Sequence, residues 1–379
     1  MLKRAKLAIT ILGALAAVFA SAQIPDTASS LETGGGADGA GGAFNVTNAD
    51  TQSGYWNPAG LGYVNSRKIG ITYRHAAASR THVTGSYQAP VRSTDEESGG
   101  GEIAHIGVTI PASDIKKGAE GTVGVSFTRG GEVDDVAVGP AAGLPDVGGP
   151  IKNYVERRKL KVDFVTLSYG KVNRAQTLAI GAGLVVAQAK VAYSESGTPV
   201  AGSWAPTAVS SNGTGVGVIL GAQYSPPKMP NTSFGISYRT EINLRGNSST
   251  SRLYDKVPSR LVIGGAARKD GLRGGKDYLV YGVQFERYGA GTRSAKVDRR
   301  AQSGFGIGVE YHYSLGSGDL PIRLGYRTVE SGGNDFGSRN AITYGVGYRP
   351  RDQAYSVDLS FSQSGGKTSF GIGATFRFK

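Results

Sequence analysis

Apolar and polar residues alternate with a period of two along most of this chain. The alternation is strictest at the C-terminus, where small or polar residues separate Phe370, Ile372, Ala374, Phe376 and Phe378. A period of two places successive side chains on opposite faces of a β-strand. Similar segments recur, and we predict fourteen strands at residues 68–87, 102–110, 119–129, 157–170, 176–193, 211–224, 232–245, 257–269, 276–288, 303–315, 320–329, 341–349, 354–362 and 367–379.

The connections between these segments alternate in length. Those after even-numbered strands are short and contain turn-forming residues, as at 316–319 and 350–353, whereas those after odd-numbered strands are mostly longer, as at 130–156. Short turns on one side and long loops on the other are typical of outer-membrane barrels. We therefore predict an all-β fold, a transmembrane antiparallel β-barrel of about 14 strands over residues 68–379, in a bacterial outer membrane.

The two faces of the predicted strands differ in chemistry. Exterior positions carry the large apolar residues, and we expect interfacial tyrosines at Tyr73, Tyr169, Tyr238, Tyr288, Tyr313, Tyr326 and Tyr348. The opposite face carries charges such as Glu310 and His312. A charge facing lipid costs about 2–4 kcal/mol at the membrane centre, so we place both residues on the lumen wall. There they form ion pairs that stiffen the wall or, alternatively, guide a ligand.

Glycines also occupy lumen positions, including Gly345, Gly347, Gly371 and Gly373. Glycine weakens a strand unless another group approaches closely. A polypeptide plug, a bound ligand, or relief of crowding beneath exterior aromatics would each explain these positions, and the pattern does not choose among them.

The first 67 residues do not alternate. Residues 1–22 have the basic start, apolar centre and Ala20-Ser21-Ala22 end of a secretory signal peptide. Residues 23–67 begin with a glycine-rich run and then contain apolar residues such as Phe44 and Trp56. Because they have apolar surface to bury, we expect them to pack against another part of the chain, and they are the only segment available as a plug, or hatch, in the barrel lumen.

Composition narrows the function classes. The 379 residues include 59 Gly and no Cys, with a net charge of +13. An exported chain without Cys has no disulfides, and closed strand pairing can replace them. The basic residues are scattered singly, which does not indicate nucleic-acid binding. The four His lie in no recognisable catalytic motif, and neither GxSxG nor HExxH occurs. We predict no enzyme, no metal site and no cofactor.

One stretch of the hatch segment resembles a known family. The sequence GGAFNVTNADTQSGYWNPAGLGYV, with Asn57-Pro58-Ala59 at its core, is similar to the N-terminal segment of the FadL/TodX family of outer-membrane transporters. Residues 233–247 and 257–269 resemble strands in the middle of that family's barrel. The resemblance implies a monomeric barrel of 14 strands, whose lumen is blocked by a hatch that includes Phe44, Trp56, Asn57, Pro58 and Ala59.

The resemblance also implies a route for the ligand. A hydrophobic small molecule, such as a long-chain fatty acid or a hydrocarbon, would bind inside and leave sideways into membrane lipid at a kink in the third strand. Gly130 and Gly131 are the kink candidates because glycine tolerates unusual backbone dihedrals. A regular third strand, fully paired to both neighbours, would contradict this placement.

Alternatives stay open at this point. The same N-terminal pattern occurs in PorV-like barrels, which shuttle or anchor secreted proteins, and a non-specific porin is a third reading. An apolar lumen pocket against the hatch would favour transport, and an apolar groove on the extracellular loops would favour a protein partner. Besides the ligand and outer-membrane lipid, we expect the barrel-assembly machinery as a partner during biogenesis.

Overall fold

The computed structural model describes residues 39–75, 78–86, 89–97, 101–139, 151–199, 208–246, 254–291, 300–330, 338–364 and 367–378. The predicted signal peptide and residues 23–38 of the predicted hatch segment lie outside these ranges. No helix in the described residues is long and apolar enough to span a bilayer.

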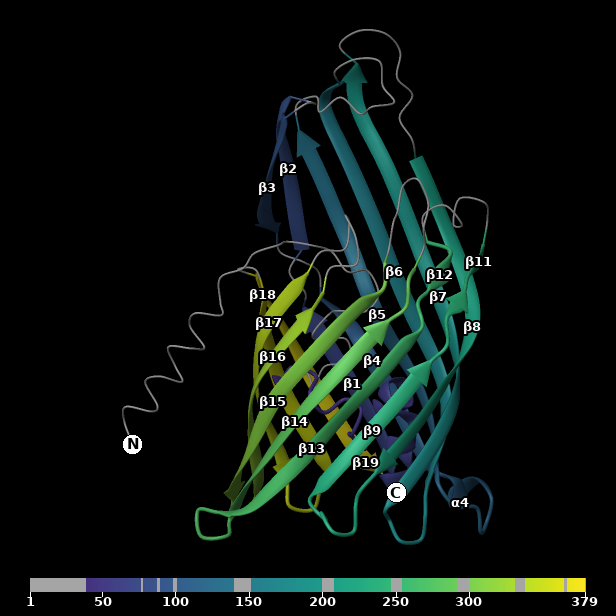
Figure 1. Ribbon diagram of the computed structural model, residues 1–379, viewed down its shortest axis with the longest axis vertical. Helices are drawn as coiled ribbons and strands as arrows, with labels where there is room; N and C mark the ends of the chain where they lie inside the picture. The colour runs from purple at the N-terminus through teal and green to yellow at the C-terminus, as the bar shows by residue number, and fades with distance from the viewer. Residues whose placement is uncertain are drawn as a thin grey trace.

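Fourteen antiparallel strands form a closed wall (Figure 1). They follow one another around the barrel in chain order, and their bounds are β1 (Arg67–His75), β4 (Gly101–Pro111), β5 (Thr122–Gly139), β6 (Ile151–Val172), β7 (Leu178–Pro199), β8 (Ala208–Tyr224), β9 (Thr232–Arg239), β13 (Arg260–Leu272), β14 (Asp277–Tyr288), β15 (Gln302–Leu315), β16 (Gly318–Val329), β17 (Arg339–Pro350), β18 (Tyr355–Ser364) and β19 (Lys367–Phe378).

The last strand closes the barrel against the first. β19 pairs with β1 from Arg67 opposite Phe378 to His75 opposite Phe370. Because this seam is closed, β1 and β19 have a neighbour on both edges, and their backbone groups find partners without water. The predicted 14-stranded antiparallel barrel is confirmed.

The wall sorts its side chains as the alternation predicts. Outward residues such as Leu167, Ile180 and Val216 are 52%, 60% and 64% exposed, as expected of a lipid-facing surface. Inward positions are buried and often polar. Tyr288 is an exception to our expectation: it is fully buried in the lumen, and its hydroxyl donates a hydrogen bond to Glu286. It occupies the same face as Glu286, two positions away, so it is not an interfacial tyrosine.

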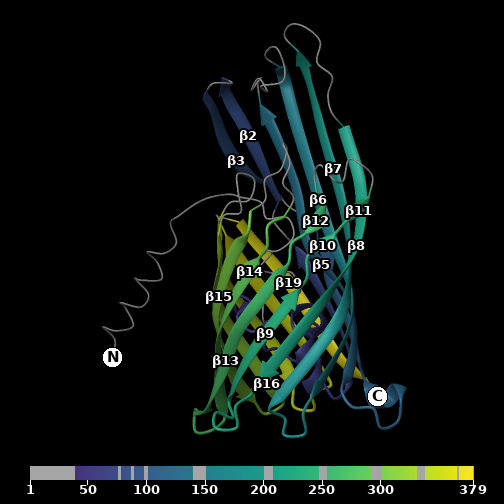
Figure 2. The ribbon, with the colours of Figure 1, turned by 45° about the vertical axis from the view of Figure 1, so that its right-hand side comes forward.

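The predicted bounds differ from the structure mainly at the extracellular ends. The first predicted strand is two elements, since β1 ends at His75 and β2 (Ala78–Ser86) pairs with β3 (Ala89–Glu97) as a hairpin. Strands β5 to β8 continue through residues predicted as loops, and together with β2 and β3 they rise well above the other strands (Figures 1 and 2).

Short elements fill the connections. Between β9 and β13 the chain forms β10 (Ile242–Asn243), β11 (Arg245–Gly246) and β12 (Lys256–Val257), so the seventh wall strand ends at Arg239, earlier than predicted. β10 pairs with β12, and β11 adds to β8. A single helical turn, α4 (Ala112–Ile115), lies in the turn between β4 and β5.

Candidate functional site

The chain from Gly39 to Ser66 lies inside the barrel, where it appears in purple in Figures 1 and 2. We call this segment the hatch. It contains the helical turn α3 (Ser53–Trp56) and the 3₁₀ helix η1 (Pro58–Tyr63). Phe44, Trp56 and Ala59 are 9%, 1% and 0% exposed, and Pro58 is also buried. The predicted hatch residues thus pack within the lumen.

Asn57 joins two parts of the hatch to the wall. Its Oδ1 accepts a hydrogen bond from the Ala59 amide at 3.1 Å and so caps η1, which begins with Pro58. Its Nδ2 donates to the carbonyl oxygens of Val46 at 2.7 Å and Ala222 of β8 at 3.2 Å. One amide side chain therefore fixes the start of the 3₁₀ helix, the preceding loop and a wall strand together.

A ring of inward glycines surrounds the hatch. On twelve wall strands a side chain at such a glycine would meet hatch atoms within 4 Å, and these residues are Gly70, Gly107, Gly124, Gly170, Gly181, Gly221, Gly235, Gly264, Gly282, Gly306, Gly308, Gly325 and Gly345. Gly41 of the hatch itself has φ of +68°, and a methyl there would come within 2.9 Å of the Tyr326 backbone. The absence of a side chain at these glycines thus lets the wall backbone and the hatch backbone approach each other.

The four wall glycines named from the sequence have different surroundings. A methyl at Gly345 would lie 3.4 Å from the Gly39 Cα atom, so this glycine faces the hatch. One at Gly347 would instead meet the carboxylate of Asp358. Gly373 lines a cavity below the hatch, and the carbonyl of Gly371 accepts a bond from the hydroxyl of a neighbouring strand. Close approach by the hatch therefore explains the glycine at position 345 but not the other three.

Polar side chains of the wall bind the hatch backbone around its whole circumference. The contacts are Val46 N to Gln284 Oε1 at 2.9 Å, Gln223 Nε2 to Thr47 O at 2.9 Å, Thr343 Oγ1 to Gly39 O at 3.1 Å, and Ser168 Oγ to Gly54 O at 3.2 Å. Backbone bonds within the hatch, such as Ala43 N to Ala40 O and Asn57 N to Ser53 O, satisfy some of its buried groups, and these wall side chains satisfy others.

Glu310 and His312 belong to an ionic group on the wall. Glu310 accepts hydrogen bonds from His312 and from Arg323 of the next strand. Arg323 Nη1 also lies 2.7 Å from Asp358 Oδ1 on β18. All four side chains are nearly buried. They join β15, β16 and β18, and the link from β16 to β18 crosses β17. This is the arrangement expected of charges that stiffen a wall.

An apolar cluster lies directly above the hatch. Its members are buried residues of α3, of the wall strands β6 to β8, and of the connection between β9 and β13: Tyr55, Trp56, Val162, Phe164, Val185, Ala187, Ala189, Ile219, Ile242, Leu244, Tyr254 and Val257. The hatch helix η1 packs nearer the short turns, against Gly170 and Gly181. The cluster is therefore on the side of the long connections, which is extracellular in a barrel of this kind.

Two buried arginines border this cluster. Arg239 and Arg260 are paired neighbours on β9 and β13 and are 1% and 2% exposed. The guanidinium of Arg260 lies 4.4 Å from the ring centre of Trp56 and donates to the Tyr55 carbonyl at 2.5 Å. That of Arg239 lies 4.8 Å from the ring centre of Phe164. Cation–π contact thus stabilises the aromatic face of the cluster.

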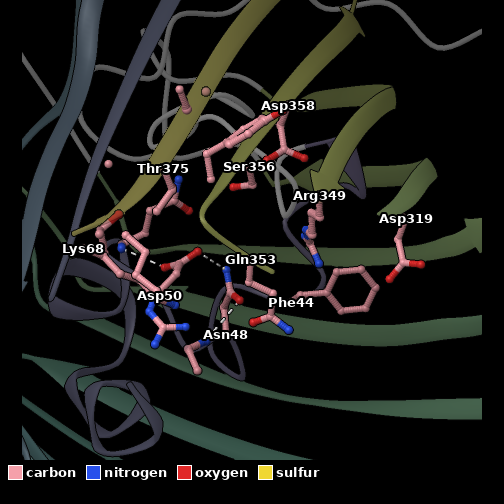
Figure 3. Close-up of a pocket in the computed structure, with 18 of the residues that line it drawn as sticks. Phe44, Asn48, Asp50, Lys68, Asp319, Arg349, Gln353, Ser356, Asp358 and Thr375 are labelled. Atoms are coloured by element: carbon pink, nitrogen blue, oxygen red, sulfur yellow. Dashed lines mark hydrogen bonds between the residues drawn. The ribbon is translucent and has the colours of Figure 1, made fainter. Parts of the chain in front are cut away.

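A cavity of about 640 Å³ lies on the opposite side of the hatch (Figure 3). Its lining is largely polar and includes Asp50, Lys68, Asp319, Arg349 and Asp358. Several of these residues stand at the ends of strands next to the short turns, so the cavity is periplasmic. The hatch consequently lies between the packed apolar cluster and a polar cavity.

Asp50 is the charged hatch residue in that cavity. Its carboxylate accepts hydrogen bonds from Asn48 Nδ2 at 2.7 Å and from the Gln52 amide at 2.8 Å. Loss of solvation inside the barrel raises the pKa of Asp50 above its ordinary 3.8, although the Gln52 amide and the charge of Lys68 oppose this. Lys68 faces Asp50 across the cavity in Figure 3. The hatch therefore holds a carboxyl group whose ionised form is disfavoured.

The third wall strand is irregular where the sequence suggested a kink. The pairing of β5 with β6 shifts register between Arg129 and Gly131, which leaves Gly130 as an extra residue in β5. A side chain at Gly130 would overlap the ring of Phe164. The pairing of β5 with β4 runs from Thr122 to Thr128 and extends no further in the residues described. Strand three is thus neither regular nor fully paired.

The described residues contain no group of three side chains suited to hold a metal ion. The sequence also did not indicate the charged residues around the irregular part of β5, which are Arg74, Glu102, Arg129, Lys161 and Asp163. They come from four different strands, and only the register shown by the structure brings them together.

The geometry can be compared with known barrels. A FadL homologue from Pseudomonas aeruginosa matches over 95% of this chain and 100% of its own, with a TM-score of 0.58 and 14% identity. The toluene transporter TbuX of Ralstonia pickettii matches over 92% and 99%, with the same score and identity. The toluene transporter TodX of P. putida matches over 94% and 99%, with a TM-score of 0.57 and 12% identity.

The protein has the FadL-type barrel fold. This agreement over nearly the whole of each chain confirms the suspected resemblance at the level of the fold. A family model described as a YadA-like membrane anchor domain also matches residues 328–378, which correspond to the last wall strands. No curated protein matches the sequence. A closed FadL-type barrel with an apolar exterior is a protein of the bacterial outer membrane.

Proposed function

We propose that this FadL-type barrel is a channel that takes up hydrophobic small molecules across the outer membrane. The apolar cluster above the hatch carries this proposal. A general porin has a polar, water-filled lumen. Here aromatic and aliphatic side chains from α3, three wall strands and the β9–β13 connection converge inside the barrel instead. A site that binds an apolar molecule is mostly lined by such side chains.

The polar cavity below the hatch supports a sideways exit. Transfer of an apolar molecule into a space lined by charged groups is unfavourable, because its surface returns to water. The described periplasmic side of the hatch offers that kind of space. The irregular part of β5, by contrast, borders Phe164 of the apolar cluster. We propose that the ligand passes from the cluster through the wall at this place and enters the membrane.

The solved relatives favour the same class of ligand. Two of the barrels with this fold are named toluene transporters. A long-chain fatty acid and a small hydrocarbon are both compatible with the apolar cluster, whose two arginines could additionally attract a carboxylate. No catalytic role is part of this proposal, and we expect the barrel to act as a monomer.

The proposal is tested by ligand recovery and uptake. We expect apolar molecules to copurify with the barrel and to be detectable by mass spectrometry of an organic extract. A deletion strain should take up radiolabelled toluene or oleate more slowly, and the wild-type gene should restore the rate. Phe164→Gln, which places an amide in the cluster, should not restore it.

A matched control is Lys171→Gln, which removes an exposed ion pair with Glu120 near a periplasmic turn and should behave like the wild type. If the barrel carries no apolar molecule and its loss leaves both uptake rates unchanged, the channel proposal is wrong.

A further inference from the structure

The wall lacks part of its backbone pairing between β4 and β5. Both strands are bulged there, β4 at Ala104, where its register with β1 shifts, and β5 at Gly130. The ladder between them ends at the pair His105–Thr128. Beyond this pair, residues 101–103 pair with β1 only, and the bulged Ala104 has no partner in that ladder. We call this unpaired stretch the β4–β5 gap.

Five charged side chains meet at the β4–β5 gap. Glu102 is the centre, because its carboxylate receives Arg74 Nη2 at 2.6 Å, Lys161 Nζ at 3.3 Å and, in closer contact, Arg129 Nη1. Arg129 Nε also lies 2.6 Å from Asp163 Oδ1. Among the side chains that the structure describes, Glu102 contacts all three cations, and Asp163 contacts Arg129.

These side chains start from opposite faces of the wall. Arg74 is 2% exposed and lies opposite Glu102 on the lumen face. On β6, Val162 and Phe164 are fully buried in the lumen, so Lys161 and Asp163 start from the outer face. Because Arg129 contacts both Glu102 and Asp163, the ion pairs pass through the wall rather than along one side of it.

The gap has apolar surroundings on both sides. On the inside, the ring of Phe164 lies against Gly130 and belongs to the cluster above the hatch. On the outside, Tyr73 and Ile103 are 41% and 43% exposed and lie at the level of the gap. An opening at this place would join the apolar cluster to membrane lipid, with these charged side chains between them.

We propose that Glu102 is the latch of this opening. Ion pairs through Glu102 hold β4 and β5 together where backbone hydrogen bonds are missing, and the wall opens when these ion pairs separate. A regular ladder opens only by leaving amide and carbonyl groups unpaired in lipid, which is costly. Charged side chains at the gap can instead turn toward water or headgroups, as long cationic side chains do. The latch deepens the proposed function, because it names the residue that controls the sideways exit.

Removing the latch charge has a definite expected effect. In Glu102→Gln the cations Arg74, Arg129 and Lys161 lose their common partner and repel one another. We expect amide hydrogen exchange of residues 101–104 and 129–131 to become about tenfold faster in the intact barrel, as in a local opening. Exchange of β15 to β17 should not change. Glu102→Asp keeps the charge and should retain slow exchange.

Glu286→Gln is the matched control. Glu286 is also a buried glutamate paired with an arginine, Arg327 at 2.9 Å, but its strand is paired on both edges at and around this residue. This variant should leave exchange at the gap unchanged. Equal exchange in Glu102→Gln and the wild type would overturn the latch, as would an equal acceleration in the control. Heat-modifiable migration on gels verifies that each variant forms a barrel.

Uptake separates the latch from the proposed function. With radiolabelled toluene as the probe, Glu102→Gln cells should take it up several-fold faster than the wild type. Faster exchange without any toluene or oleate uptake by either protein would support the latch as a wall opening and overturn the channel proposal. Normal wild-type uptake with unchanged exchange and uptake in Glu102→Gln would overturn the latch and leave the channel.

Discussion

The two edges of β1 are built differently. Toward β19, every residue from Arg67 to His75 has a partner in unbroken register, and β19 continues in the same way to β18. Toward β4, the register shifts after Thr72, and the next ladder around the wall, β4 to β5, stops at His105. One side of the barrel is closed by backbone hydrogen bonds, and the other is completed by side-chain charges.

This difference shows that a barrel can be irregular without being open. The closing seam joins residues far apart in the chain, and only a full ladder keeps it shut in lipid. The β4–β5 gap lies between neighbouring strands that a ladder already joins on the periplasmic side. Ion pairs are sufficient to complete such a wall, and they can separate again more easily than a ladder.

The largest expected effect is at the regular seam. Deletion of residues 370–379 removes the partners of β1 and leaves two unpaired edges, so we expect no inserted barrel. The measurement is heat-modifiable migration of the outer-membrane fraction. The matched control replaces residues 78–97, the β2–β3 hairpin next to the gap, with a short Gly-Ser linker and should still form a barrel. A heat-modifiable truncated protein would show that the seam does not need β19.

A bulky residue in the glycine ring should have the next largest effect. Gly308→Val on β15 would place a side chain against the carbonyl of Ala40, a backbone group that cannot turn away. We expect a loss of about 1–3 kcal/mol in the free energy of unfolding, the usual range for overpacking. The measurement is the midpoint of denaturant unfolding in micelles.

Two further variants sharpen this result. Gly130→Ala, at the gap, places a methyl group against a phenylalanine ring, which can shift. The free energy of unfolding should therefore fall less in this variant. Gly316→Ala, in an open turn, should not lower the free energy of unfolding to a comparable extent. If Gly308→Val and Gly316→Ala unfolded at the same midpoint, the hatch would not pack as closely against Gly308 as the structure indicates.

Loss of the Asn57 amide should loosen the hatch. Asn57→Ala leaves the buried carbonyl of Val46 and the partly buried carbonyl of Ala222 without this donor, at a cost of about 1–3 kcal/mol. In a Trp204→Phe background, Trp56 is the single tryptophan and reports on the hatch. We expect acrylamide to quench its fluorescence more strongly in the variant. Unchanged quenching would mean that the glycine ring alone retains the hatch.

The smallest expected effect concerns Asp50, whose neighbour Thr51 packs against Gly70 of β1 and Gly107 of β4. Because the pKa of Asp50 is raised above 3.8 in the folded protein, its ionisation opposes folding. Stability of the hatch should therefore rise as the pH falls from neutrality through this raised pKa. Asp50→Asn should remove that part of the pH dependence of Trp56 quenching. If Asp50→Asn showed the same pH dependence of Trp56 quenching as the wild type, this role of Asp50 would be contradicted.

Much of the fold could be predicted because alternation is a local signal. The number of wall strands, their periplasmic ends and the final strand follow from period-two runs and short turns. The extracellular ends were less certain, since β5 to β8 continue beyond the membrane, where no lipid selects apolar residues. There the alternation fades although β5 continues to Gly139 and β6 begins at Ile151, so the pattern predicts a loop over 130–156.

The site was predictable only where one segment carries it. Asn57, Pro58 and Ala59 are adjacent, and their resemblance to a known hatch indicated their place. The partners of Glu102 gave no such signal, because Arg74, Arg129 and Lys161 lie on different strands and start from different faces. Which of them meet depends on two bulges, and single-residue insertions in a ladder are not visible in the alternation.

The glycine ring also constrains the order of assembly. Its members leave a wall with almost no inner side chains at one level, and the hatch supplies the missing atoms from Gly39 to Tyr63. The hatch precedes β1 directly in the chain, so it is tethered at the seam that closes last in sequence. A barrel that closed without the hatch would lack these atoms at that level of the lumen. Because glycines of twelve wall strands contact the hatch, we expect the hatch to be in place before β19 closes the wall against β1.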